Sequence, residues 1–138
     1  MADWRAGALA EIENLKPYWV DKYDWRPDHV VGDDAIDLFI HIRSRRLGRD
    51  FLLRLRYRDD WETAGRRETF VSTDDRTQEG LEFWPPASAV RGVNPQNQPP
   101  AICLKGVWGY HSVLHPAERP DGTTLLAFLI ELQRVMDE

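Results

Sequence analysis

Cysteine, lysine and long apolar runs are all scarce in this 138-residue chain. The one cysteine, Cys103, excludes a disulfide within the chain, and the four histidines have no further cysteines to join in a structural zinc site. Every apolar run is far shorter than the roughly 18 residues that a membrane-spanning helix needs. Residues 1–19 lack the positively charged and then apolar pattern of a signal peptide. We therefore expect one cytoplasmic domain, residues 1–138, without a membrane partner, a metal or a cofactor.

Lysine occurs only at positions 16, 22 and 105, so arginine supplies most of the positive charge. The formal net charge of −5 and the pI of about 5.4 argue against nucleic acid as a partner. Arginines nonetheless crowd one region, at Arg43, Arg45, Arg46, Arg49, Arg54, Arg56 and Arg58. Their spacing favours a charged sheet face, either solvated or docked to an acidic partner. The arginine bias is typical of GC-rich genomes and is compatible with a bacterial origin.

Alternating apolar and polar residues predict an antiparallel sheet. The expected strands span residues 36–43, 51–58, 67–72 and, more briefly, 81–84. The link that contains Gly48 joins the first two strands as a hairpin, and a turn centred on Gly65 precedes the third. Because strand side chains alternate, Arg54, Arg56 and Arg58 are expected to face away from Leu53, Leu55 and Tyr57.

Apolar residues at helical spacing predict a helix at each end of the chain. The first is expected over 3–16, with Asp3 as its cap and Pro17 ending it. The last is expected over 122–136, with Asp121 or Thr123 as its cap. Its buried stripe is expected to comprise Leu125, Phe128, Leu129, Leu132, Val135 and Met136.

A proline-rich segment separates the predicted sheet from Cys103. Residues 85–100 contain five prolines and one glycine, which exclude a regular helix and the interior of a sheet. Long irregular segments in compact domains are usually functional or disordered. This one leads into the apolar triplet Ile102-Cys103-Leu104, which favours a functional loop. The order of helix, antiparallel strands, irregular segment and helix indicates an α+β fold.

Cys103 allows two interpretations from the residues alone. Free cysteine is among the most buried residue types, so it could be a small core side chain. A nucleophilic cysteine instead needs access and either a lowered pKa or a nearby base. Cys103 ends a loop, and His111 and His115 follow within a dozen residues, which fits the second interpretation. Both remain open at this point.

Three motifs in order resemble the ubiquitin-conjugating enzymes. They are Trp84-Pro85-Pro86, Asn94-Pro95-Gln96-Asn97 and Ile102-Cys103-Leu104, followed by a terminal amphipathic helix. In that family a Pro-Pro segment leaves an antiparallel meander, and a His-Pro-Asn motif lies shortly before an active cysteine. The resemblance implies the family's fold: an N-terminal helix, a meander sheet, a long active-site loop and a C-terminal helix.

The chain departs from the family pattern at several points. No His-Pro-Asn triplet is present; Asn94-Pro95-Gln96 lies near its place, and Asn97 is a competing equivalent. Residues 105–111 lack the usual tryptophan-serine-proline pattern, and one helix is expected after the cysteine. In this the chain looks more like the divergent bacterial conjugating enzymes that occur beside ubiquitin-like proteins, often in antiviral defence operons.

The resemblance implies a mechanism. Cys103 would accept a ubiquitin-like protein as a thioester from an activating enzyme and pass it to an amine of a target protein. Asn94 or Asn97 would donate a hydrogen bond to the oxyanion. His111 is the preferred base or positioning residue, and His115 is the second choice.

Two other functions remain open. One is a catalytically silent variant of the same fold, which binds a ubiquitin-like protein or an activating enzyme; the altered Asn-Pro-Gln motif favours it. The other is an unrelated α+β interaction domain with a buried cysteine. A metal enzyme is disfavoured because His111 and His115 have no evident third ligand nearby.

Overall fold

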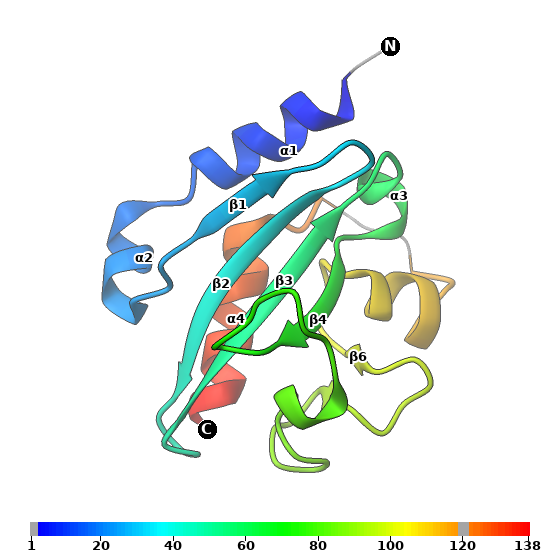
Figure 1. The fold of residues 1–138 in the computed structure, drawn as a ribbon. Helices are drawn as coiled ribbons and strands as arrows, with labels where there is room; N and C mark the ends of the chain where they lie inside the picture. Colours follow the sequence, from blue (N-terminus) through cyan, green and yellow to red (C-terminus); the bar gives the residue numbers. More distant parts are fainter. Residues whose placement is uncertain (1–2, 119–121) are drawn as a thin grey trace.

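The computed structural model of the protein describes residues 3–118 and 122–138, and it is a mixed α+β fold (Figure 1). Its centre is a four-stranded antiparallel sheet in the order β1-β2-β3-β4, a meander. The strands are β1 (Asp28–Val31), β2 (Ile36–Ser44), β3 (Arg49–Tyr57) and β4 (Arg67–Val71). The predicted hairpin and third strand are therefore confirmed, whereas β1 was not foreseen.

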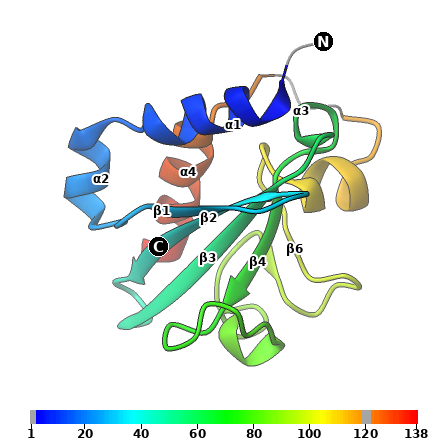
Figure 2. The ribbon, with the colours of Figure 1, turned by 45° about the horizontal axis from the view of Figure 1, so that its top comes forward.

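Two helices lie on one side of this sheet. Helix α4 (Leu125–Asp137) lies behind the strands in Figure 1, and Figure 2 shows α1 (Trp4–Glu13) next to it. The first turn of α4 is tied to α1, because the Leu125 N–H donates to Oε1 of Glu11 at 3.2 Å. Within the described ranges, each helix is too short or too polar to cross a lipid bilayer.

The N-terminal helix is shorter than expected. Asp3 caps α1 as predicted, since its carboxylate accepts the Arg5 N–H at 3.0 Å, but the helix ends at Glu13 with Asn14 as its C-cap. Pro17 does not end a helix; it begins a second one, α2 (Pro17–Tyr23). Proline is favoured at the first helical position because its fixed φ suits the helix and its missing N–H would have no partner there.

The C-terminal helix also begins later than expected. Thr124, not Thr123, is its N-cap, and the Thr124 hydroxyl accepts the Ala127 N–H at 3.1 Å. Gly122 has φ +86°, a left-handed conformation that cannot belong to the helix, so the helix starts beyond it. Asp121, the other predicted cap, lies outside the described residues. The predicted apolar stripe is buried in full.

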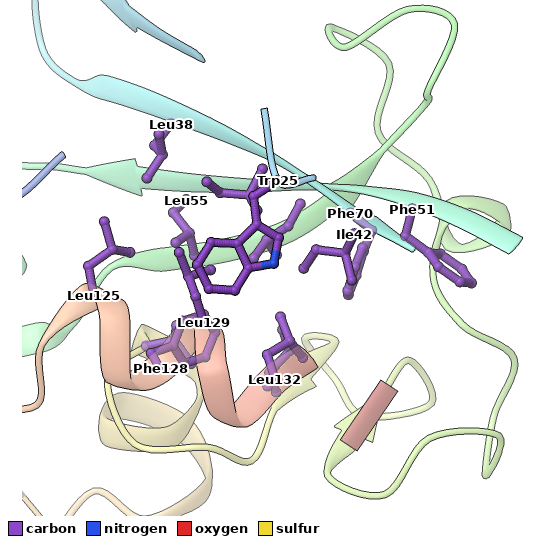
Figure 3. Close-up of a cluster of buried hydrophobic side chains, with 14 of the residues drawn as sticks. Trp25, Leu38, Ile42, Phe51, Leu55, Phe70, Leu125, Phe128, Leu129 and Leu132 are labelled. Atoms are coloured by element: carbon purple, nitrogen blue, oxygen red, sulfur yellow. The ribbon is translucent and has the colours of Figure 1, made fainter. Parts of the chain in front are cut away.

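The core lies between the sheet and the helices (Figure 3). Trp25 follows α2, is fully buried and points toward α4, where its indole N–H donates to Oε1 of Gln133 at 3.0 Å. The Gln133 amide in turn donates to the Arg43 carbonyl oxygen at 2.9 Å. Gln133 was absent from the predicted stripe; its hydrogen bonds join α4 to both Trp25 and the end of β2.

The alternation in β3 is confirmed. Leu53, Leu55 and Tyr57 are fully buried, whereas Arg54, Arg56 and Arg58 line one groove on the outer face. This face is not wholly solvated, because segment 72–80 passes in front of it in Figure 1. Glu79 of that segment pairs with Arg54 at 3.3 Å, and only 8% of Arg54 is exposed.

The segment after β4 contains short elements that periodicity could not predict. Residues 81–84 do not form a strand; Leu81–Phe83 is a single 3-10 turn, η1. The proline-rich segment holds a two-residue strand, β5 (Val93–Asn94), which pairs with β6 (Ala101–Ile102).

Two further helices were not predicted: α3 (Trp61–Ala64), which precedes β4, and a π-helix, η2 (Gly109–Leu114). Consequently two helical segments follow Cys103, not one.

Candidate active site

Cys103 lies where β6 ends, directly after the buried Ile102. Its backbone N–H donates to the Gly92 carbonyl oxygen at 2.6 Å, which extends the pairing of β5 and β6 by one step. The side chain is partly exposed and the thiol is free. The structure thus places Cys103 at the end of the proline-rich loop, as predicted, and not within the core.

His115, the second-choice base, is the histidine that reaches the cysteine. Its Nε2 lies 3.5 Å from Sγ of Cys103. The His115 backbone N–H donates to the Tyr110 carbonyl oxygen at 2.8 Å, a five-residue step that extends the π-helix η2. The same step places the Tyr110 ring beside the imidazole, with centroids 4.5 Å apart.

His111, the preferred base, is directed elsewhere. Only 5% of the residue is exposed, and both ring nitrogens have partners. Nε2 accepts the Gly106 N–H at 3.0 Å, so Nδ1 carries the hydrogen and donates to the Glu118 carbonyl oxygen at 2.8 Å. With both nitrogens bound to the backbone, His111 fastens the loop before η2 to the segment after it. The geometry favours His115 as the candidate base.

Burial and a nearby carboxylate both disfavour the thiolate of Cys103. Burial, and then the negative charge of Glu118, raise its pKa above the usual value. The Glu118 carboxylate accepts a hydrogen bond from the Tyr110 hydroxyl, which is the main reason that the Glu118 pKa is lowered. A reaction at Cys103 therefore needs a base to remove the thiol proton, and the imidazole of His115 is within contact distance.

Asn94 shares a hydrogen-bond acceptor with Cys103, whereas Asn97 binds a different carbonyl oxygen. The Asn94 amide donates to the Gly92 carbonyl oxygen at 3.4 Å, the same oxygen that accepts the Cys103 N–H. This bond is long, so the amide can reorient at little cost. The Asn97 amide instead donates to the Pro99 carbonyl oxygen at 2.8 Å. Of the two candidate oxyanion donors, the structure favours Asn94.

A buried carboxylate that was not identified from the sequence binds backbone N–H groups on both sides of the site. Glu68 of β4 accepts the Ile102 N–H and the Gly109 N–H, each at 3.0 Å. Only 9% of the residue is exposed, and this burial raises its pKa to about 7. The sequence places Glu68 in an expected strand but does not show which segment packs beside that strand. The contacts of Glu68 with residues 102 and 109 could therefore not be predicted.

Nothing in residues 3–118 and 122–138 groups three or more His, Cys, Asp or Glu side chains so that they could hold a metal ion. Comparison of the whole chain with protein-family models, with curated proteins and with solved structures yields no match. The chemistry proposed below therefore rests on the residues and their geometry, together with the motif resemblance.

Proposed function

We propose that this chain is a conjugating transferase with a ubiquitin-conjugating-enzyme-like fold, which carries a ubiquitin-like protein as a thioester on Cys103. The observation that carries the proposal is the contact between Cys103 and His115, 3.5 Å from Sγ to Nε2, at the partly exposed end of the proline-rich loop. A free thiol with a histidine at this distance is the arrangement that cysteine nucleophiles require.

The order of elements also supports the proposal. An N-terminal helix, a four-stranded antiparallel meander, an irregular proline-rich segment, the cysteine and a C-terminal helix follow one another in that order. This is the layout that the resemblance implies. The chain adds α2 between the first helix and the sheet, and its helix after the cysteine, η2, is of the π type.

Charging would exchange one thioester for another. His115 Nε2 takes the thiol proton, and Sγ of Cys103 attacks the acyl carbonyl held on the cysteine of an activating enzyme. The new sulfur–carbon bond forms, the old one breaks, and the activating enzyme's thiolate leaves. The partly buried thiol has a raised pKa, so this proton transfer is a necessary part of the step.

Transfer to the target would be a second acyl transfer, from Cys103 to an amine. A neutral amine, such as a lysine of the target protein, attacks the Cys103 thioester carbonyl. The Asn94 amide donates a hydrogen bond to the oxyanion as the tetrahedral intermediate forms. An amide bond forms, the bond to Sγ breaks, and His115 accepts the proton that the amine releases.

A charging assay tests the proposal. The chain is incubated with ATP, its cognate ubiquitin-like protein and its cognate activating enzyme, and is then run on gels with and without a thiol reductant. We expect an adduct that the reductant removes, because thioesters are labile to thiols. Cys103→Ser should give a reductant-resistant oxyester or no adduct, and Cys103→Ala should give none. A folded wild-type chain that stays uncharged with these partners would exclude the transferase.

The raised pKa of Cys103 favours a second candidate, the catalytically silent variant. Such a protein would bind the ubiquitin-like protein or the activating enzyme without a covalent step. The same assay separates the two functions: a complex that forms equally with wild type and Cys103→Ala, and that leaves no adduct on a denaturing gel, would support the silent variant.

A further inference from the structure

The Glu68 carboxylate joins β4 to two segments that lie more than 30 residues after that strand in the sequence. Its Oε2 accepts the Ile102 N–H and its Oε1 accepts the Gly109 N–H, both at 3.0 Å. Ile102 ends β6, whereas Gly109 begins η2. One buried side chain therefore holds two backbone segments at a fixed distance from β4 and from each other.

The site is shaped closely around this carboxylate. A Cβ atom added at Gly109 would lie 2.2 Å from Oε2 of Glu68, which is too short for any non-bonded contact. Glycine at this position therefore allows the N–H of η2 to approach the carboxylate. The Cβ of Ala101 would lie 2.8 Å from the same added atom, so a methyl group at position 109 would also clash on this side.

Both segments lead directly to the reactive pair. Ile102 precedes Cys103, and η2 carries Tyr110 and leads into His115, whose Nε2 lies 3.5 Å from the cysteine sulfur. We propose that Glu68 is the positioning residue of the Cys103–His115 pair: by holding the N–H before the cysteine and the first N–H of η2, it sets the separation of thiol and imidazole. This inference rests on the function proposed above and adds a residue to the same site.

The role requires a carboxylate. Both oxygens of an ionised glutamate accept hydrogen bonds, which suits two N–H donors. Glutamine at the same place has one acceptor oxygen and one NH₂ group, so one of the two backbone donors would face another donor. Glu68→Gln thus changes the hydrogen bonding of one of the two segments while it conserves the size of the side chain.

The test uses Cys103 as its own probe, because the chain has one cysteine. The rate of alkylation by iodoacetamide is measured against pH, and its midpoint reports the thiol pKa. In the wild-type background, His115→Ala should raise this midpoint by about one pH unit, because the thiolate loses a hydrogen-bond partner. In the Glu68→Gln background the same His115→Ala change should leave the midpoint unmoved, because the pair is already apart.

Glu79→Gln is the matched control. It is also a glutamate near β4, but it pairs with Arg54 on the outer face, away from the cysteine. In that background the shift caused by His115→Ala should remain as in wild type. Gly109→Ala supplies a second route to the same result, because its methyl group displaces the Glu68 carboxylate. Near-ultraviolet circular dichroism shows which variants are folded.

Each outcome decides the inference. A loss of the His115→Ala shift in folded Glu68→Gln or in folded Gly109→Ala supports it. An undiminished shift in both folded variants overturns it, and so does failure of both to fold, since Glu68 would then hold the whole fold and not the pair. No shift in the wild-type background also overturns it. The measurement needs no partner protein, so these results are distinct from a failure of Cys103 charging.

Discussion

The aromatic ring of Tyr110 lies against the imidazole of His115, with the ring centroids 4.5 Å apart and the planes inclined by 34°. His115 lies just beyond the last residue of η2, so the contact with Tyr110 restrains the orientation of its imidazole. Ring pairs of this kind contribute about 1 kcal/mol beyond the area that they bury. The aromatic ring, more than the hydroxyl, is therefore expected to orient His115 toward Cys103.

Tyr110→Ala should slow discharge of the Cys103 thioester to a free amine by up to about tenfold, which corresponds to about 1.4 kcal/mol. Tyr110→Phe keeps the ring and removes only the hydrogen bond to Glu118, so it should discharge at close to the wild-type rate. Single-turnover discharge of the charged protein measures both. Equal losses in the two variants would assign the effect to the hydroxyl instead.

The two histidines should have opposite signatures. His111→Ala leaves the Gly106 N–H and the Glu118 carbonyl oxygen without partners and should lower the free energy of unfolding by about 1–3 kcal/mol. His115→Ala should cost no more than about 1 kcal/mol, the value of its ring contact with Tyr110, and should slow discharge by about 100-fold or more. Urea denaturation and the discharge assay give the two values. Normal discharge by His115→Ala would remove it as the base.

A buried ion pair should carry much of the stability. The Glu11 carboxylate of α1 accepts hydrogen bonds from the Arg66 guanidinium and, at 2.7 Å, from the Tyr57 hydroxyl. Glu11→Ala leaves Arg66, of which only 4% is exposed, without its counter-ion and should cost about 3–5 kcal/mol. Denaturant titration measures this loss. Glu13→Ala on the exposed side of the same helix is the control, and an equal effect there would contradict the account.

Glu68 should make stability depend on pH. Burial raises its pKa from 4.5 to about 7, and the backbone hydrogen bonds from Ile102 and Gly109, followed by the charge of Arg67, oppose this shift. Because the folded protein holds the proton more tightly than the unfolded chain, the contribution of Glu68 is fully present below pH 4.5 and is lost as the pH rises through about 7.

Relative to Glu68→Gln, the free energy of unfolding of the wild-type chain should therefore fall by about 3 kcal/mol across this pH window. Parallel stability curves for the two proteins would show that Glu68 does not titrate there.

The sequence predicted β2, β3, β4 and the two terminal helices, but it missed β1, α2, α3 and η2. The alternation around Leu53 and Leu55 and the stripe that contains Phe128 place β3 and α4 well, because burial on one face dictates their period. Pro17 was misread because proline both ends and begins helices. Glu11 was not singled out from the sequence, yet it binds Arg66, a partner that only the tertiary fold supplies.

The candidate site was predicted in part for a similar reason. The position of Cys103 after a proline-rich loop follows from the motif spacing. The choice of His115 over His111 depends on the π-helix η2, whose five-residue hydrogen bond has no signature in the apolar pattern. Glu68 acts through backbone N–H groups, which every residue except proline possesses, so no residue type marks its partners.

The intact mass of the charged protein shows whether Cys103 carries an acyl group. After incubation with ATP, activating enzyme and ubiquitin-like protein, we expect one added mass equal to that of the ubiquitin-like protein less one water. Digestion should locate it at Cys103, and neutral hydroxylamine should release it. A wild-type chain that keeps its own mass under these conditions, or an adduct that maps to a lysine and persists in Cys103→Ala, would contradict the claim that Cys103 carries the acyl group.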